Sequence, residues 1–291
     1  MYLLMKTTTN HESAEATNVV VVGTVRNVGK SLENEISNLN TALGVFQQVK
    51  WLLIESDSTD ETVQVLDRLK TENSNFNYQS MGKLDQSMPD RTERIAYCRN
   101  SYLEEIERNP CYKDSDLIIM ADLDGINNIL SQSAIKSCFY KNDWDVCFAN
   151  TKGPYYDIWA LRHPTWCPSD CLQQFGFLKK HGWGEYAARF AAIYSKMITI
   201  PPDSPWIQVQ SAFGGFALYK KKSVTGLRYN AFHEGLAICE HVSFHENMTK
   251  AGSKLFINPH LLNCKFPPHT KKLRFPDNLL LRLRILLSPS P

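Results

Sequence analysis

The stretch Leu117-Ile118-Ile119-Met120-Ala121-Asp122-Leu123-Asp124 decides the fold. An unbroken apolar run of this length is typical of a strand that is buried on both faces of a sheet. Two carboxylates, one residue apart, follow at its carboxyl end, which is the edge where ligands bind in open α/β sheets. Carboxylate oxygens suit Mg²⁺ or Mn²⁺. The stretch therefore predicts a buried strand that ends in a site for a divalent cation carrying a diphosphate.

The sequence before this stretch alternates between strand and helix patterns. We expect strands over 18–25, 51–55 and 75–81, and helices over 31–48, 61–69 and 91–107. After it, the pattern predicts helices over 131–140 and 240–250, and strands over 145–149, 213–219 and 254–257. Residues 150–211 are rich in aromatic residues, Pro and Gly, and we expect an irregular segment that builds a binding site or a lid. The alternation favours an α/β protein with a mostly parallel central sheet flanked by helices.

Composition excludes some classes of function. The chain has 291 residues, 43% of them hydrophobic, with 32 Lys and Arg against 30 Asp and Glu. Such a balance does not favour nucleic acid as a partner. The 8 Cys include no Cys-x-x-Cys pair. Cys167 and Cys171 near His163 could begin a zinc site, but ordinary reduced thiols are the interpretation we favour.

Four motifs in the first half resemble a known family. Val21-Val22-Gly23-Thr24-Val25-Arg26-Asn27, Glu55-Ser56-Asp57-Ser58-Thr59-Asp60-Glu61-Thr62, Arg99-Asn100 and Asp122-Leu123-Asp124 are similar to the ordered motifs of family 2-type glycosyltransferases with the GT-A fold. In the second half, Tyr156-Asp157-Ile158-Trp159-Ala160-Leu161-Arg162, Phe213-Gly214-Gly215-Phe216 and Cys239-Glu240-His241 look more like the capsule-associated mannosyltransferase family.

The resemblance implies a fold and a reaction. It implies a single Rossmann-like GT-A domain, with a nucleotide-sugar-binding half at 18–150, an acceptor-binding and catalytic half at 151–268, and a basic, leucine-rich tail at 269–291. The implied reaction moves a sugar from a nucleotide-diphosphate sugar to a glycan or lipid-linked glycan in surface polysaccharide synthesis, with Mn²⁺ or Mg²⁺ as cofactor. The donor sugar, the linkage and its stereochemistry stay open.

The resemblance also assigns roles to residues. The metal ligands would be Asp124 and Asp122, with His260 as a third. The same Asp122 would contact the nucleotide sugar, together with a further set of residues: Thr24, Arg26, Glu55, Asp57, Arg94 and Gly215. Glu240 would be the catalytic base and His241 its competitor, because an inverting transfer needs a group that accepts the acceptor's proton. Asp157 and Trp159 would bind the acceptor.

Two other functions remain as alternatives. Asp122-Leu123-Asp124-Gly125-Ile126 also resembles the signature of haloacid dehalogenase-like phosphatases, in which the first Asp is a nucleophile. Ile126 stands where that signature has Thr, and no Gly-Asp dipeptide occurs in the chain. A non-catalytic nucleotide-sugar-binding protein on the same fold is the second alternative.

The ends of the chain suggest where the protein works. We find no secretory signal and no apolar stretch of about 20 residues that could span a bilayer. We therefore expect a cytoplasmic protein. The leucines and cations of the tail fit either peripheral contact with the inner face of the membrane or a C-terminal helix docked on the domain.

Overall fold

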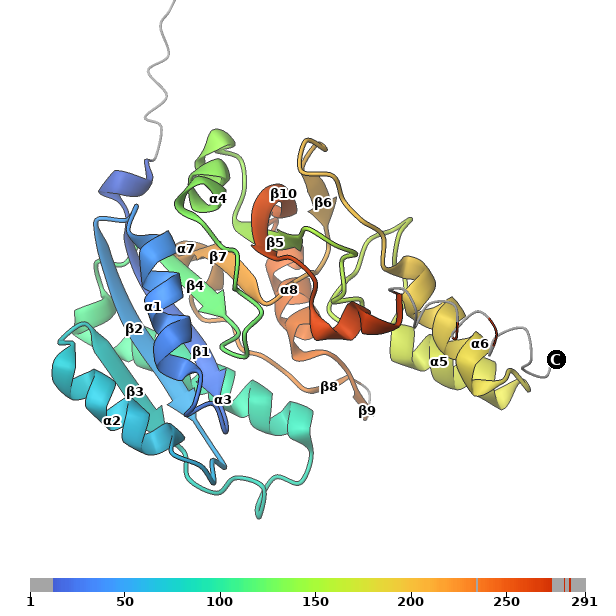
Figure 1. Ribbon diagram of the computed structural model, residues 1–291, viewed down its shortest axis with the longest axis horizontal. Helices are drawn as coiled ribbons and strands as arrows, with labels where there is room; N and C mark the ends of the chain where they lie inside the picture. Colours follow the sequence, from blue (N-terminus) through green and yellow to red (C-terminus); the bar gives the residue numbers. More distant parts are fainter. Residues whose placement is uncertain (1–12, 234, 274–279, 281–282, 284–291) are drawn as a thin grey trace, which may run out of the picture.

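The computed structural model describes residues 13–233, 235–273, 280 and 283. Within these residues, eight strands form one sheet in the order β3-β2-β1-β4-β7-β5-β10-β6, which Figure 1 shows. The strands are β1 (Asn18–Val25), β2 (Gln48–Glu55), β3 (Phe76–Ser80), β4 (Leu117–Ala121), β5 (Val146–Thr151), β6 (Ile207–Val209), β7 (Phe216–Lys220) and β10 (Leu255–Cys264). A separate hairpin pairs β8 (Phe232–His233) with β9 (Leu236–Ala237).

Most neighbouring strands run parallel. β1 pairs in parallel with both β2 and β4, β2 with β3, and β5 with β10. β7 is antiparallel to β4 and to β5, and β6 is antiparallel to β10. Because β7 lies between β4 and β5, those two strands point the same way, so β1, β2, β4, β5 and β10 all end at one edge. The predicted α/β architecture with a mostly parallel sheet is confirmed.

Helices cover both faces of the sheet. On one face, α1 (Leu32–Leu43), α2 (Thr62–Glu72) and α4 (Gln132–Lys136) pack on side chains such as Val21 and Ile119. On the other face, α3 (Arg91–Arg108) and α8 (Glu240–Lys250) pack on side chains such as Val22 and Met120. Successive residues of a strand point to opposite faces, so the continuous apolar runs supply both cores. This explains why β1 and β4 carry no polar alternation.

The region from 150 to 211 differs from its prediction as an irregular segment. It contains α5 (Cys171–Lys180) and α6 (Glu185–Ala192), which project to one end of the molecule in Figure 1. The Asp170 side chain caps α5 by accepting hydrogen bonds from the backbone N–H groups of Leu172 and Gln173. We missed both helices because Gly176 and Gly184 lie within or beside them, and glycine usually marks a break in a helix.

Some predicted boundaries also moved. The helix predicted over 31–48 ends at Leu43, and strand β2 already begins at Gln48. The last strand runs on to Cys264, through Pro259, by a shift of register against β5. A bulge of this kind accommodates the missing N–H of proline. Gly214 and Gly215 lie before β7 rather than within it.

Most of the predicted tail, 269–291, lies outside the described residues, and its first part forms the short helix η5 (Pro268–Leu273). The remaining short elements are α7 (Lys221–Val224) and the 3₁₀ turns η1 (Ala14–Ala16), η2 (Pro110–Tyr112), η3 (Ser137–Tyr140) and η4 (Tyr194–Lys196). Among the described helices, none has the length and apolar character required to cross a bilayer.

We predict that Gly23→Ala destabilises the protein and that Gly176→Ala does not. A Cβ at position 23 would lie 2.6 Å from the carbonyl oxygen of Ala121, so strands β1 and β4 would have to separate. Gly176 has open space at the same position within α5, and alanine there should stabilise the helix by about 0.5–1 kcal/mol. Urea unfolding of the two variants measures both effects, and equal midpoints would contradict the account.

Candidate functional site

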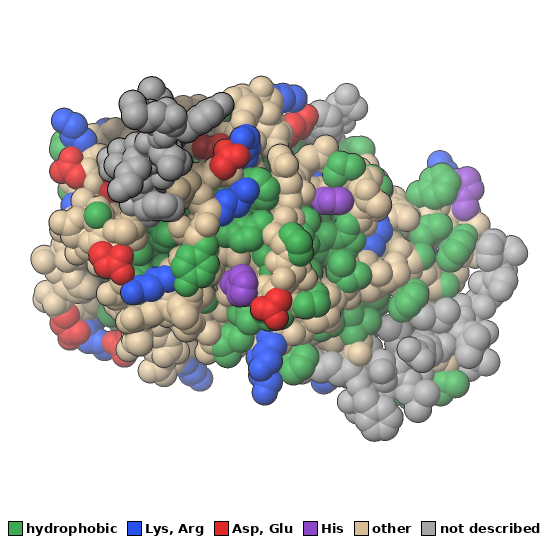
Figure 2. Space-filling view, turned by 90° about the horizontal axis from the view of Figure 1, so that it is seen from above, with side chains coloured by type: hydrophobic (Ala, Val, Ile, Leu, Met, Phe, Trp, Pro, Cys, Tyr) green, Lys and Arg blue, Asp and Glu red, His purple; other side chains and the backbone are tan. Residues whose placement is uncertain are grey.

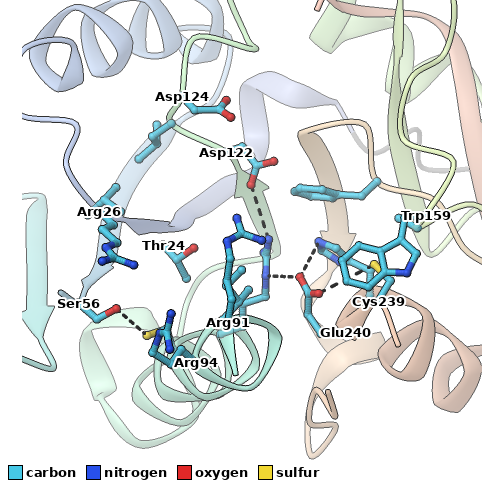
Figure 3. A pocket seen from close by; sticks show the side chains of 18 of the residues that line it. Thr24, Arg26, Ser56, Arg91, Arg94, Asp122, Asp124, Trp159, Cys239 and Glu240 are labelled. Atoms are coloured by element: carbon cyan, nitrogen blue, oxygen red, sulfur yellow. Dashed lines mark hydrogen bonds and ion pairs between the residues drawn. The ribbon is translucent and has the colours of Figure 1, made fainter. Parts of the chain in front are cut away.

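The carboxyl ends of β1, β2 and β4 open into a cavity of about 370 Å³, drawn in Figure 3. Helices α3 and α8 and the segment after β5 complete its wall. Ten of the predicted site residues line it: Thr24, Arg26, Asp57, Arg94, Asp122, Asp124, Asp157, Trp159, Glu240 and His241. The structure thus brings together residues that lie more than 200 positions apart in the sequence.

Arg99 on α3 lies between the residues that follow β4 and those that begin helix α8. Its guanidinium is 3.6 Å from Asp122 Oδ1 and 3.2 Å from Glu240 Oε1, with only 6% of the side chain exposed. The guanidinium carbon is 5.3 Å from the centre of the Phe213 ring and 5.7 Å from that of Tyr229. Such contacts hold a cation in place after it has lost its water.

Sequence reasoning chose Arg94 on α3 and left Arg99 out of the site, because Arg99 was less clearly aligned with Arg91 and Arg94. The residues of α3 that line the cavity share one face of the helix: Arg91, Arg94, Ile95, Cys98 and Arg99. Their spacing repeats at three and four residues, as a single helix face requires. Extending that pattern from Arg91 and Arg94 by one more turn would have found Arg99.

Arg94 fixes the loop that carries Asp57. Its Nη1 donates to the carbonyl oxygens of Met88 and Pro89, and its Nε lies 3.5 Å from Asp57 Oδ2. Asp57 adopts a left-handed backbone conformation, with φ of 58°, and its Oδ1 accepts a hydrogen bond from the backbone N–H of Asp85. Burial opposes ionisation, yet hydrogen bonds from Asp85 and Ser56 and the nearby Arg26 and Arg94 together lower the pKa of Asp57.

The two aspartates after β4 differ in their surroundings. Asp124 is exposed, and its carboxylate makes no ion pair or hydrogen bond with any described residue. Asp122 is partly buried and faces Arg99. Burial, together with the charges of Asp124, Asp157 and Glu240, raises the pKa of Asp122 to about 7, and Arg99 opposes the rise. The cluster therefore holds more negative charge than Arg99 alone neutralises.

A glycine pair before β7 positions this cluster. The Gly214 N–H donates to Asp157 Oδ2 over 3.0 Å, and the Gly215 carbonyl accepts from the Asp122 backbone N–H over 2.9 Å. Both glycines have positive φ, and a Cβ on Gly215 would lie 2.6 Å from Ile126. Gly215 was predicted to contact the nucleotide sugar; it does not line the cavity, and the structure gives it this supporting position.

Asp157 is held by the backbone alone. Besides the Gly214 N–H, its Oδ1 accepts from the Ala160 N–H over 3.4 Å, and no Lys or Arg of the described residues pairs with it. Burial raises its pKa despite these two hydrogen bonds, the nearby Glu240 adds to the rise, and His269 opposes it. Its carboxylate is thus oriented by backbone N–H groups, and among the described residues it has no ion pair like those that Arg99 makes with Asp122 and Glu240.

Glu240 and His241 begin helix α8 and are both buried. His241 Nε2 lies 3.9 Å from Glu240 Oε1, and its ring stacks on Phe213 at a centroid distance of 4.0 Å. Neither ring nitrogen of His241 has a hydrogen-bond partner among the described residues. Burial, with Arg99 and His245 nearby, lowers its pKa well below the usual value, so the ring is neutral at pH 7.

Two predicted residues lie elsewhere. Glu55 is buried at the end of β2, where its carboxylate accepts hydrogen bonds from the Ser58 N–H and the Ser80 hydroxyl, and it does not line the cavity. His260 is exposed on β10 and is likewise absent from the lining. His269 of η5 comes nearer to the site, because its ring stacks on that of Tyr156 at 5.2 Å.

No set of three described His, Cys, Asp or Glu side chains could hold a metal ion between them. This result is at odds with a zinc site at His163, Cys167 and Cys171, where His163 Nδ1 instead accepts from the N–H groups of Thr165 and Trp166. A metal ion bound by Asp122 and Asp124 would therefore need its remaining ligands from water or from a substrate. Mg²⁺ commonly binds in that way, through one or two carboxylates and phosphate oxygens.

Comparison with known proteins gave structural matches but no sequence match. No family model and no curated protein sequence matches the chain. A mannosyltransferase from Pyrobaculum calidifontis, in complex with GDP-Man and Mn²⁺, aligns over 93% of this chain at 9% identity and a TM-score of 0.49. The chain spans 62% of that protein's length.

Two further matches are of the same quality. TarS from S. aureus aligns over 94% of this chain and 67% of its own, at 12% identity and a TM-score of 0.45. Glucosyl-3-phosphoglycerate synthase from Mycobacterium tuberculosis, in complex with UDP, aligns over 93% of this chain and 78% of its own, at 12% identity and a TM-score of 0.41. Similarity at this level is too distant to carry residue roles, so the function has to be argued from the cavity.

We predict that His245 makes the protein less stable in mild acid. Its ring is buried between the Ser211 and Tyr219 hydroxyls, at 2.9 and 2.8 Å. Burial and Arg99 lower its pKa from 6.5 to about 3. The unfolded chain therefore binds a proton at a higher pH than the folded one. The stability that neutral His245 provides is complete above pH 6.5 and is lost as the pH falls toward 3.

Urea unfolding at about pH 7 and about pH 4.5 measures the loss of this stability, which should be about 2.5 kcal/mol between the two pH values. In His245→Gln the loss of stability between the two pH values should shrink by that amount. The exposed His181 is a matched control, and His181→Gln should behave as the wild type does. An unchanged loss in His245→Gln would contradict the prediction.

Proposed function

We propose that this protein is a metal-dependent glycosyltransferase that moves a sugar from a nucleotide-diphosphate sugar to a glycan or lipid-linked glycan. The observation that carries the proposal is the division of charge within one cavity. Arg26, Arg91 and Arg94 line one end of the cavity, formed by β1, β2 and α3, and Figure 3 shows Arg26 and Arg94 on the opposite side from Glu240. At the other, acidic end, Asp122 and Glu240 pair with Arg99, and both lie near the Asp157 carboxylate. A donor with an anionic diphosphate and a neutral sugar is complementary to such a division.

The cationic end suits the nucleotide. Thr24 lies at the carboxyl end of β1, Arg26 follows β1, and Asp57 follows β2, so all three lie at the edge where nucleotides bind to parallel sheets. Arg91 makes no ion pair with any described residue, which leaves its guanidinium available for phosphate. Arg94 is held by Asp57 and by two carbonyls, so its role is to fix the loop around the base and ribose.

The carboxylates fit a divalent cation. Asp124 is exposed without a partner among the described residues, and burial and the neighbouring carboxylates raise the pKa of Asp122, an effect that a bound cation would oppose. Asp124 would bind the ion directly, with Asp122 beside it. His260 is poorly situated to assist, whereas His269 stacks beside the cluster. When bound, Mg²⁺ or Mn²⁺ would offset the charge that develops on the leaving diphosphate.

The acidic end suits the acceptor, and Trp159 offers an aromatic face for a sugar ring there.

The sequence pointed to Glu240 or His241 as the catalytic base. An ion pair with a guanidinium weakens a carboxylate as a proton acceptor, and Glu240 has such a partner in Arg99. Asp157 has no such partner, and burial and the nearby Glu240 raise its pKa, which suits a proton acceptor. We therefore assign proton acceptance to Asp157 and the positioning of Arg99 to Glu240.

The two alternative functions are less well supported. A phosphatase of the haloacid dehalogenase type would use Asp122 as a nucleophile, but Arg99 and the crowded carboxylates surround that side chain. A non-catalytic binding protein would need the cationic end of the cavity to hold a nucleotide sugar. It would not need a proton acceptor such as Asp157, whose carboxylate is oriented by two backbone N–H groups at the acidic end.

We predict that one nucleoside diphosphate raises the melting temperature in a metal-dependent manner. The panel is UDP, GDP and dTDP, with CMP as the monophosphate, each with and without Mn²⁺. At a hundredfold excess over Kd a ligand stabilises the folded state by about 2.7 kcal/mol. Asp124→Asn should lose the part of the shift that depends on the metal, because it removes the exposed ligand.

Asp143→Asn is the matched control, since Asp143 is an exposed aspartate that pairs with Lys254 away from the cavity. It should respond to nucleotide and metal as the wild type does. The absence of a shift with every nucleotide would overturn the proposed donor site.

A further inference from the structure

The helical hairpin formed by α5 and α6 carries an unusual surface. The two helices pack on each other and project from the end of the molecule that Figure 1 shows at the right. Large apolar side chains on this hairpin and the segment after it are exposed: Leu172 by 45%, Phe177 by 60%, Phe190 by 37% and Ile198 by 46%. Figure 2 shows hydrophobic side chains on this end of the molecule as well as across its middle.

The exposed residues of α5 share one side of the helix. Leu172, Phe177, Lys179 and Lys180 are all exposed, whereas Cys171 is buried. At about 100° per residue, these four positions and the other exposed residues of α5, Gln173 and Gly176, fall within less than half a turn. Apolar and basic side chains are thus presented together on α5, as in helices that lie in a membrane interface.

The region that contains the hairpin is more basic than the rest of the chain. Residues 171–198 contain four basic residues (Lys179, Lys180, Arg189 and Lys196) and a single acidic one, Glu185, which gives a net charge of +3. The whole chain carries only +2, so the remainder is slightly acidic. Lys179 and Arg189 both pair with Glu185, and the Lys180 ammonium makes no ion pair with any described residue.

We propose that the α5–α6 hairpin docks this protein on an anionic lipid bilayer. The exposed Phe177 and Leu172 side chains would enter the headgroup region, and Lys179 and Lys180 would lie against lipid phosphates. Charge complementarity favours a lipid surface over a second copy of the chain, because two copies would bring +3 against +3. The inference is independent of the reaction in the cavity and of the predicted tail.

Vesicle co-sedimentation of the full chain tests the proposal. The vesicles are pure phosphatidylcholine, or phosphatidylcholine with about a third phosphatidylglycerol, at low and high salt. Each basic residue near an anionic surface contributes about fivefold to binding, and salt screens that contribution. The wild type should therefore pellet with the anionic vesicles at low salt, and at least about tenfold less with neutral ones.

Two variants identify the surface. Leu172→Ser with Phe177→Ser should reduce binding at least about tenfold, and Lys179→Glu with Lys180→Glu should reduce it still more. Matched controls are Tyr140→Ser, which alters an aromatic residue that is 78% exposed on η3, and Lys222→Glu, which reverses an exposed charge on α7. Both controls should bind as the wild type does. Circular dichroism checks that each variant is folded.

Three results would overturn the proposal. The first is a wild type that ignores anionic vesicles, and the second is equal binding to neutral ones. The third is undiminished binding by the folded hairpin variants, which would move the contact to another surface such as the tail. Size-exclusion chromatography tests whether a second copy of the chain binds the hairpin instead. If the wild type is a dimer that does not bind vesicles, and Phe177→Ser converts it to a monomer, the hairpin is a self-association surface.

Discussion

The contact of Arg99 with Asp122 and Glu240 is the interaction on which the rest of the site depends. It joins a strand end of the first half of the chain to a helix of the second half, with Arg99 and Glu240 almost wholly buried. Removing one partner of a buried ion pair typically costs about 3–5 kcal/mol, because the other charge is left without compensation. The three side chains therefore have to be retained together, and they set the distance between the cationic and acidic ends of the cavity.

The glycine pair before β7 is the second constraint on this arrangement. Gly214 and Gly215 place a backbone N–H against Asp157 and a carbonyl against the Asp122 N–H, in conformations with positive φ that other residues rarely adopt. Asn263 from β10 donates a hydrogen bond to the Gly214 carbonyl over 2.7 Å and so ties the pair to the sheet. The orientation of two cavity carboxylates thus depends on backbone geometry rather than on further charged side chains. A site built in this way can keep an excess of negative charge for a cation to neutralise.

The sequence was sufficient to predict the first half of the fold and most of the cavity. Continuous apolar runs such as 18–25 and 117–121 can be buried only in a sheet covered on both faces, and the polar residues that follow them must then meet at one edge. Asp122 and Asp124 were chosen for this reason, whereas Asp57 was chosen because its motif resembles one of the family 2-type glycosyltransferases. The roles of Arg99 and Gly215 depend on contacts with residues more than 80 positions away, Glu240 for the first and Asp122 for the second. The helices α5 and α6 were missed because their internal and flanking glycines mask the helical period. His260 was chosen for its place late in the chain, and only the path of β10 and η5 shows that His269 comes nearer to the cluster.

The most direct test of the central claim is the release of nucleoside diphosphate from nucleotide sugars by the wild type and by Asp157→Asn, with Mn²⁺ present. A transferase hydrolyses its donor slowly even when water is the only acceptor. The account predicts steady release from a donor that carries the stabilising nucleotide, and loss of that release in Asp157→Asn while nucleotide binding is retained. Binding of the intact donor without any release by the wild type would contradict it and would indicate a nucleotide-sugar-binding protein.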